Sequence, residues 1–294
     1  YGMSFFEAIL LGLVQGITEF LPVSSSGHLI ILEQLLDIKT DAGVLFEVML
    51  HMGTLIAVCT VFWEDLKRMF REILRIGSDL IFNLKVFLRN KIHDREEERY
   101  KKILHNNYRK LVMMIVISSV PTGILGYLLK GIVEAVSSSL LAAGLGMLIT
   151  AILLLVVDYW DFGDKIPKDM KSSQAFMIGI CQGISVFPGI SRSGITITSG
   201  LLCGLRKSFA VKYSFLISIP AILGAMLLEL QDFATFSINF QTGAIYVSGM
   251  IVAAITGYFA IRMLLAVVQR RKFKIFAGYC MIVGVGAIVC DFIL

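Results

Sequence analysis

Residues 15–28 read QGITEFLPVSSSGH, and residues 182–195 read QGISVFPGISRSGI. Aligned with a one-residue gap, the two stretches share Gln-Gly-Ile, then Phe and Pro, then Ser-x-Ser-Gly. Both interrupt long apolar sequence with charged, hydroxyl and proline residues. A charge at the centre of a bilayer helix costs at least ~2.5–3.5 kcal/mol, so charged residues in such segments are functional candidates. We therefore expect the repeated stretch to form the functional site.

The composition is that of a membrane protein. Only 17% of the 294 residues are charged and 56% are hydrophobic, whereas a soluble domain carries roughly 25% charged residues. Apolar runs recur at the roughly 17–25 residues that a spanning helix needs, and strand-like alternation is absent. We predict an all-α polytopic membrane protein with six transmembrane helices. The predicted spans are 43–63, 111–130, 139–158, 213–230, 243–264 and 275–294.

The net charge of +5 is unevenly distributed. Basic residues crowd between residues 63 and 111 and recur at 165–171, 206–212 and 270–274. The only basic residues in the other connections are Lys39 and Lys130. The positive-inside rule places the basic connections in the cytoplasm. From these features we predict that the protein lies in the membrane and crosses it several times.

The two polar stretches lie in apolar regions 4–36 and 174–204, and a proline breaks the helix in each. Cytoplasmic charges flank the second region on both sides, so we predict re-entrant helix pairs that enter from opposite faces. A single membrane domain, 1–294, would then hold two inverted repeats, about 4–158 and 174–294. Residues 64–110 are expected to form a cytoplasmic amphipathic insertion on the inner leaflet.

The prolines also predict an anion site. After Pro22 a helix must restart, and Ser24, Ser25 or Ser26 can cap it or contact a ligand. Helix starts present free backbone N–H groups and the positive end of the helix dipole, which suit phosphate. The second stretch repeats this arrangement and adds Arg192, a residue suited to bidentate phosphate recognition. We expect the two tips to meet and to share one pocket.

Glu19 and His28 are the other intramembrane polar groups of the first stretch. Glu19 would repel phosphate unless a cation such as Mg²⁺ or Ca²⁺ lies between them. Alternatively Glu19 carries a proton or pairs with Arg192. His28 can serve as general acid or base or only as a structural donor. Glu47 and His51 lie one helical turn apart in one span, and a packing role is as consistent with the sequence as participation.

Taken together, residues 15–28 and the stretch Pro188-Gly-Ile-Ser-Arg-Ser-Gly-x-Thr196 resemble the undecaprenyl-diphosphate phosphatase family of bacterial inner membranes, of the bacitracin-resistance type. The resemblance covers nearly the whole chain. It implies a divalent-metal-dependent hydrolase that removes one phosphate from the C55 polyprenyl diphosphate and recycles the lipid carrier for cell-wall synthesis. It also implies a bacterial inner-membrane location and a pocket open to the external face.

The resemblance assigns roles by position. The acidic motif falls on Gln15 and Glu19, and Gln15 stands where other members carry Glu, which argues against a two-carboxylate metal site. Ser26 stands where many relatives have Thr. The predicted catalytic residues are Glu19, Ser25, His28 and Arg192, with Glu19 also the metal ligand. The predicted substrate-binding residues are Gln15, Ser24, Ser26, Gly27, Ser191, Ser193, Gly194 and Thr196.

Two mechanisms and two functions stay open at this stage. Ser25 can attack phosphorus while His28 removes its proton, or His28 or Glu19 can activate a water. The rival function is a secondary transporter or flippase of polyprenyl phosphate or another anion, since inverted repeats with broken helices are also transporter architecture. The expected partners are a polyprenyl diphosphate lipid and the membrane, with no nucleic acid. A homodimer is one assembly open to the chain.

Overall fold

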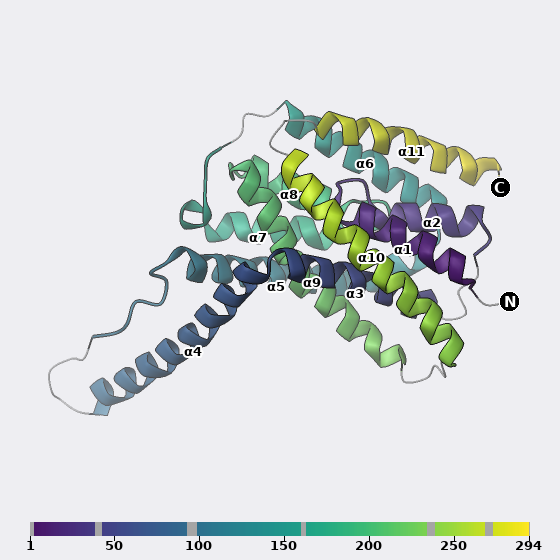
Figure 1. Ribbon diagram of the computed structural model, residues 1–294. Coiled ribbons are helices and arrows are strands. Elements are labelled where there is room, and N and C mark those ends of the chain that lie inside the picture. Colours follow the sequence, from purple (N-terminus) through teal and green to yellow (C-terminus); the bar gives the residue numbers. More distant parts are fainter. Residues whose placement is uncertain are drawn as a thin grey trace.

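The computed structural model describes residues 3–38, 43–92, 99–159, 163–233, 239–267 and 273–293. Within these ranges the chain is helical and has no β-strand (Figure 1). The helices are α1 (Phe5–Phe20), α2 (Ser25–Leu35), α3 (Gly43–Val61), α4 (Trp63–Ile92), α5 (Asn107–Val136), α6 (Leu140–Asp158), the short 3-10 helix η1 (Pro167–Asp169), α7 (Ser172–Ile184), α8 (Arg192–Leu202), α9 (Lys207–Phe233), α10 (Phe240–Val267) and α11 (Phe273–Ile293).

The predicted fold class, an all-α polytopic membrane protein, is confirmed. Five described helices, α5, α6, α9, α10 and α11, are long and apolar enough to cross a membrane. Helix α3 is the sixth when it is taken with α4, from which an 84° bend separates it. Two spans begin earlier than hydropathy predicts, at Asn107 and Lys207. The reason is visible at α5, where the Asn106 side chain accepts the amide of Arg109 at 2.8 Å and starts the helix among polar residues.

Both proline-containing stretches are broken helices, as predicted. Helix α1 ends at Phe20, and the extended Leu21 leads into Pro22. Helix α7 ends at Ile184, and α8 begins only after Pro188 and Ser191. Within each pair the two short helices contact each other. Neither half is long enough to span a bilayer by itself. That the pairs are re-entrant and enter from opposite faces stays a prediction, which these short halves support.

The helix packing of the two halves corresponds pair by pair. Helix α1 packs on α10 and α7 packs on α5, while α10 contacts α3 and α5 contacts α9. Glycines permit the close approach at equivalent places. A Cβ on Gly12 would lie 2.4 Å from the carbonyl oxygen of Gly249, and one on Gly179 would lie 2.2 Å from that of Ser118. The division into repeats of about 4–158 and 174–294 stays a prediction, which this correspondence supports.

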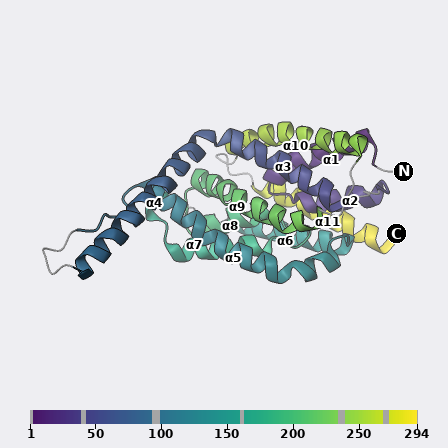
Figure 2. The same ribbon diagram turned by 90° about the horizontal axis from the view of Figure 1, so that it is seen from below.

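Helix α4 leaves the bundle and projects away from it (Figures 1 and 2). Large apolar side chains along it are exposed, among them Phe70, Leu74, Leu84 and Phe87. The amphipathic helix expected in this part of the chain is therefore present. Exposed apolar side chains on a helix that carries many basic residues suit the surface of an anionic leaflet. The assignment of 64–110 to the cytoplasmic leaflet stays a prediction.

A buried arginine anchors α4 to α5. Arg109 is 3% exposed, and its guanidinium donates to Glu72 and to Asp79 at 2.7 Å each. These hydrogen bonds hold the pKa of both carboxyls below their usual values. Lys101 lies 3.4 Å from the same Asp79 and ties the connection before α5 to this cluster. The direction in which α4 leaves the bundle is thus held by charge as well as by apolar packing.

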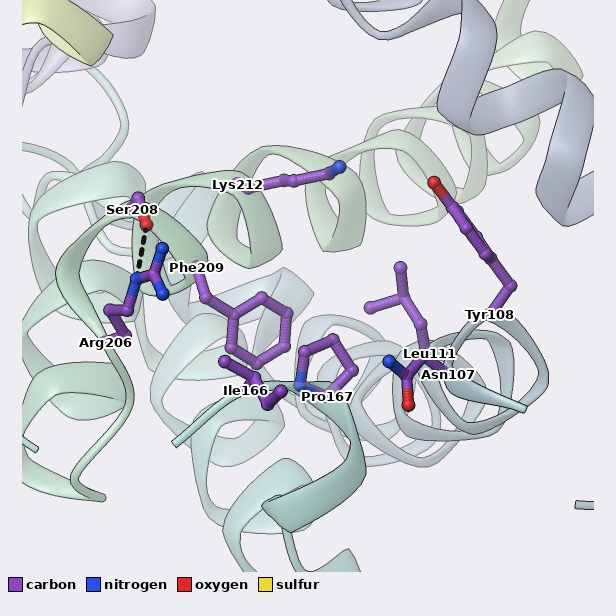
Figure 3. Close-up of a pocket in the computed structure, with 9 residues that line it drawn as sticks. All are labelled: Asn107, Tyr108, Leu111, Ile166, Pro167, Arg206, Ser208, Phe209 and Lys212. Atoms are coloured by element: carbon purple, nitrogen blue, oxygen red, sulfur yellow. Dashed lines mark hydrogen bonds between the residues drawn. The ribbon is translucent and has the colours of Figure 1, made fainter. Parts of the chain in front are cut away.

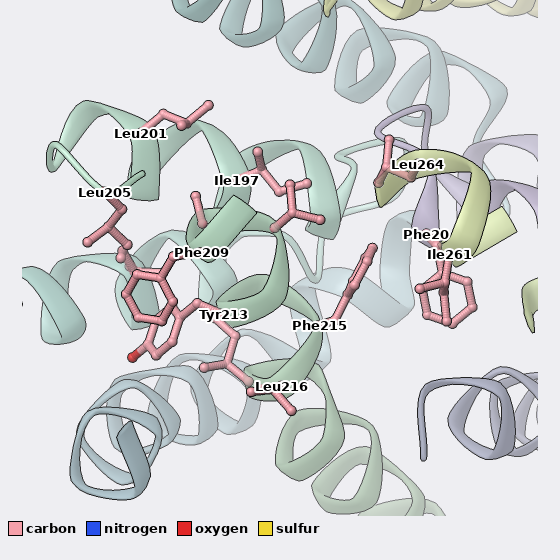
Figure 4. Packing of buried hydrophobic residues seen from close by; sticks show 14 of the residues in the cluster. Phe20, Ile197, Leu201, Leu205, Phe209, Tyr213, Phe215, Leu216, Ile261 and Leu264 are labelled. Carbon is pink, nitrogen blue, oxygen red and sulfur yellow. The ribbon is translucent and has the colours of Figure 1, made fainter. Parts of the chain in front are cut away.

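The main hydrophobic cluster holds the end of α1 in place (Figure 4). The rings of Phe20 and Phe215 meet edge to face with centroids 5.5 Å apart. Phe215 also contacts Phe62, which lies between α3 and α4. On the other side of α9, the Tyr213 hydroxyl lies 2.6 Å from Ser118 and donates to the Met114 carbonyl of α5. The residue just before Phe20 is Glu19, so this cluster also positions the candidate site.

The glycine contacts predict which substitutions the bundle tolerates. In Gly179→Ala the new methyl group would meet the backbone of Ser118, so α5 and α7 must separate. We expect a loss of about 1–3 kcal/mol, the usual cost of overpacking. Gly126→Ala on α5 is the matched control, because a Cβ there has nothing within 4 Å. Thermal unfolding in detergent should show a lower midpoint for Gly179→Ala than for the wild type, and an unlowered midpoint for Gly126→Ala. Equal midpoints for the two variants would contradict the tight α5–α7 packing.

Candidate functional site

The tips of the two broken helices meet. Arg192 at the start of α8 donates from Nη2 to Glu19 Oε1 of α1 at 2.7 Å. The Ser193 hydroxyl donates to the carbonyl of Leu21 at 3.0 Å, and the Gly189 amide donates to Ser26 Oγ at 3.3 Å. An ion pair and two hydrogen bonds therefore join residues about 170 positions apart in the chain. The two stretches named from sequence form one site.

The start of α2 is built by a serine in an unusual conformation. Ser24 has a φ of 70°, a region that non-glycine residues adopt at a cost. From there its hydroxyl accepts the amide of Gly27 at 3.2 Å and caps the helix. Ser24 thus has the structural role. The Ser26 hydroxyl lies 3.3 Å from that of Ser24, whereas the Ser25 hydroxyl points to Glu19. The amides of Ser25 and Ser26, in the first turn, have no intrahelical partner.

The start of α8 is built in the same way. The Ser191 hydroxyl accepts the amide of Gly194 at 3.1 Å, so Ser191 is the cap and Arg192 opens the helix. The Thr196 hydroxyl donates back to the Arg192 carbonyl at 2.7 Å and lies 2.6 Å from Ser214. Ser191, Gly194 and Thr196 therefore shape the tip, while the side chains of Arg192 and Ser193 and the amide of Gly189 contact the first tip.

Glu19 is the centre of the site, with its side chain 5% exposed. Besides Arg192 on Oε1, its Oε2 accepts the hydroxyl of Ser25 at 2.6 Å and the amide of Gln15 at 3.1 Å. His51 Nε2 lies 3.9 Å from the same Oε2. Of the roles that the sequence left open for Glu19, pairing with Arg192 is present in the structure. Ser25 is the hydroxyl held directly on the carboxylate.

His28 is held away from Ser25. Its Nδ1 donates to the Ser24 carbonyl at 2.6 Å, and its Nε2 lies 2.7 Å from the Tyr279 hydroxyl. The two rings are also parallel, with centroids 5.6 Å apart. In the described part of the chain no hydrogen bond joins His28 to Ser25. The hypothesis that His28 takes the proton of Ser25 has no support in this arrangement, in which Glu19 is the group on Ser25.

Two buried polar atoms at the site have no partner among the described residues: Arg192 Nη1 and Gln15 Oε1. Buried polar groups are nearly always hydrogen-bonded, so an exception asks for an explanation. The first is a donor on a cation and the second is a neutral oxygen acceptor. The site can therefore accept an anion beside Arg192 and a cation or donor beside Gln15. This is the pairing that a phosphate and a divalent cation would bring together.

Helices α6 and α11, which pack on each other, each support one tip. The Ser191 amide donates to Thr150 Oγ1 of α6 at 2.9 Å. On α11, the Cys280 thiol lies 3.6 Å from the Pro22 carbonyl, and the neighbouring Tyr279 holds His28. Sequence reasoning missed these residues. The one available signal was the hydroxyl of Thr150, which lies in an otherwise apolar span. It named His51 without deciding its role; an imidazole in an apolar span was the available signal.

The cavity of about 330 Å³ shown in Figure 3 is a separate feature. It lies where the starts of α5 and α9 meet η1, and Pro167 and Phe209 are among the residues that line it. Two cations, Arg206 and Lys212, also line it, and Lys212 pairs with Asp65 at 2.6 Å. None of the site residues named from sequence lines this cavity.

Comparison with known proteins agrees with the resemblance. The profile of the family described as "Bacitracin resistance protein BacA" matches residues 8–286. A Methanosphaera stadtmanae protein named "Undecaprenyl-diphosphatase" is 40% identical over 98% of each chain. Proteins of the same name from Halothermothrix orenii and Alkaliphilus metalliredigens are 38% and 37% identical. The alignment with the Halothermothrix protein covers 98% of each chain. The alignment with the Alkaliphilus protein covers 96% of this chain and 97% of its relative.

The Glu19–Arg192 pair makes a measurable prediction for stability. Arg192→Met should leave a buried carboxylate without its cation and cost about 3 kcal/mol, as breaking a buried pair does. Glu19→Gln should also destabilise, because it leaves Arg192 unpaired. The double variant should lose less than the sum of the two, since neither charge then remains. Thermal unfolding in detergent at one scan rate measures all four proteins, and strictly additive losses would contradict a direct pair.

Proposed function

The chain belongs to the bacitracin resistance protein BacA family, and we propose that it hydrolyses undecaprenyl diphosphate to undecaprenyl phosphate and inorganic phosphate. The product is the lipid carrier that cell-wall (peptidoglycan) synthesis uses. The relatives compared above are named for this hydrolysis, and this chain aligns with nearly the whole length of each. The protein is an enzyme in this proposal, and its substrate is a membrane lipid.

One observation carries the proposal: a guanidinium, two helix starts and a carboxylate-bound hydroxyl share one site inside apolar sequence. Arg192 already pairs with Glu19, yet its Nη1 is buried without a partner. A phosphate oxygen is the acceptor that this donor lacks. The first-turn amides of α2 and α8 add neutral donors of the kind that bind phosphate. Such preorganised donors stabilise the charge of a phosphoryl transition state, which is most of what phosphoryl transfer requires.

In the reaction the bond between the terminal phosphorus and the bridging oxygen breaks, and undecaprenyl phosphate leaves. Ser25 is our candidate nucleophile. Its hydroxyl donates to Glu19 Oε2 at 2.6 Å, so the carboxylate is placed to receive the proton as the new P–O bond forms. Water would then hydrolyse the phosphoserine and release inorganic phosphate. This assigns to Glu19 the proton-accepting part that sequence reasoning gave to His28.

A direct attack by water is the second route. Here His28 or Glu19 would activate the water, and Ser25 would only help to hold it. The His28 ring accepts from Tyr279 and donates to Ser24, so a water-activating role requires the contact with Tyr279 to open. The observed contacts favour the first route, because Ser25 and Glu19 need no rearrangement to interact.

The residues present fit a divalent cation, Mg²⁺ or Ca²⁺ in our expectation from sequence. Glu19 supplies one carboxylate, and the buried Oε1 of Gln15 is an oxygen without a partner beside it. Mg²⁺ often takes only one or two protein carboxylates and completes its shell with substrate phosphates and water. When bound, the cation would neutralise the diphosphate and end its repulsion by Glu19. With Gln15 in place of a second carboxylate, the site relies more on the substrate for its remaining ligands.

We further propose a place in the bacterial inner (plasma) membrane, with the site open to the external face. The basic connections support this orientation through the positive-inside rule. The transporter or flippase alternative has no support among the relatives compared above, which are named for hydrolysis. A homodimer and the lack of a nucleic-acid partner remain predictions from the sequence.

The activity itself is the first prediction of this proposal. Purified protein in detergent, given undecaprenyl diphosphate and Mg²⁺, should release inorganic phosphate without a membrane gradient. Arg192→Ala and Glu19→Gln should each lower the rate by at least ~10²-fold, the usual effect of removing one charge-stabilising group. His105→Gln, an imidazole outside the site, is the control. Near-normal rates in either site variant would refute the assignment, and lipid transport without hydrolysis would favour the rival function.

The nucleophile gives the second prediction. If Ser25 attacks phosphorus, rapid quenching of turnover with ³²P-labelled substrate should leave phosphate on residue 25. Ser25→Ala should then lose both the labelled protein and turnover, whereas Ser26→Ala should keep the label on residue 25. Full turnover by Ser25→Ala, or turnover that never labels the protein, would support the direct attack by water.

A further inference from the structure

The imidazole of His51 faces the site with its Nε2. It lies on α3, where its Nδ1 donates to the carbonyl of Glu47 in its own helix at 2.9 Å. In the neutral ring this hydrogen bond places the proton on Nδ1 and leaves Nε2 as the unprotonated nitrogen. That Nε2 is the atom that lies 3.9 Å from Glu19 Oε2. A ring N–H held by a backbone carbonyl is also the usual second contact of a metal-binding histidine.

The separation between His51 and Glu19 is too long for a direct bond and leaves room for a shared ion. At 3.9 Å the two atoms are too far apart for a hydrogen bond. Two ligands of one octahedral cation with bonds of about 2.1 Å lie roughly 3.0 Å apart in adjacent positions and ~4.2 Å apart in opposite ones. The distance falls between these limits. In the described part of the molecule no other side chain contacts both Nε2 and Oε2.

Gln15 supplies an independent observation at the same carboxylate oxygen. Its amide nitrogen donates to Glu19 Oε2 at 3.1 Å, and its buried Oε1 has no partner. A half-turn of the amide exchanges the two atoms and brings the oxygen to Glu19 Oε2. Gln182, the equivalent in the second repeat, also leaves Oε1 without a partner, but its amide contacts Thr122 and a backbone carbonyl. Only Gln15 of the two therefore lies against a carboxylate.

We propose that His51 Nε2 is a nitrogen ligand of the divalent cation, together with Glu19 and the Gln15 amide oxygen. This deepens the proposed function, on which it rests for the presence of a cation. The described residues contain no group of three His, Cys, Asp or Glu side chains able to hold a metal, so phosphate and water complete the shell. A neutral nitrogen ligand favours first-row transition-metal cations over Mg²⁺ and Ca²⁺, which take oxygen ligands, and Mn²⁺ is the member of that series whose ligand preferences lie nearest to those of Mg²⁺. His51 thus sets which cation the site selects.

The test is a measurement of metal binding without any lipid substrate. Mn²⁺ is titrated into tag-free protein in detergent, and pulsed EPR records the coupling of bound Mn²⁺ to ¹⁴N. We expect a ¹⁴N coupling in the wild type and in His28→Gln, and none in His51→Gln. The Mn²⁺ Kd of His51→Gln should rise about tenfold, whereas the Mg²⁺ Kd measured by competition should change less than about twofold, because Mg²⁺ relies on oxygen ligands.

The chain contains four histidines, which provides a second variant if His51→Gln does not fold. In the triple variant His28→Gln, His93→Gln and His105→Gln, His51 is the only imidazole left, and the ¹⁴N coupling should remain. Mn²⁺ that binds without this coupling, a coupling that persists in His51→Gln, or no Mn²⁺ binding at all would each overturn the inference.

Phosphate release is measured separately on the same preparations. A ¹⁴N coupling without hydrolysis of undecaprenyl diphosphate would sustain the metal ligand and remove the proposed function. Hydrolysis by a protein whose bound Mn²⁺ shows no nitrogen coupling would sustain the proposed function and remove His51 as a metal ligand. The two proposals therefore fail in distinguishable ways.

Discussion

The buried ion pair between Glu19 and Arg192 is the interaction on which the site depends. Each charge lies in an apolar segment, and an unpaired charge there costs several kcal/mol even after relaxation. The carboxylate gains Arg192 on one oxygen and Ser25 and Gln15 on the other. Arg192 is left with a buried N–H that has no partner. The pair therefore holds the two tips together while leaving one donor for a ligand, which is how a structural contact can also be a binding site.

Two helices at equivalent places in the halves make this meeting possible. Chain that is not helical needs partners for its backbone groups when it lies at membrane depth, because no water is there to supply them. On α6, Thr150 accepts the amide of Ser191. On α11, Cys280 contacts the carbonyl of Pro22 and Tyr279 contacts His28, both in the first tip. Since α6 and α11 pack on each other, the two supported tips are brought face to face. The packing of the halves and the chemistry of the site are thus one arrangement.

Residues in the repeated stretch were predictable to different degrees. Proline and serine act through local geometry, so the breaks at Pro22 and Pro188 and the serine caps could be read from sequence. The pairing of Glu19 with Arg192 was named as an alternative, because two lone opposite charges in apolar segments have few other partners. The partner of His28 could not be named. Helical spacing places His28 near Ser24, but its ring direction depends on Tyr279 from the far end of the chain.

The sequence by itself determined that the chain is helical, that it crosses a membrane several times, and that two broken segments carry the polar groups. These properties follow from composition and from local sterics, which nearest neighbours in the chain settle. Only the tertiary structure decided which group holds Ser25, where His28 points, and that the imidazole of His51 lies beside Glu19. Those facts depend on distances between helices that are remote in sequence, and such distances arise from packing of the whole bundle rather than from any one segment.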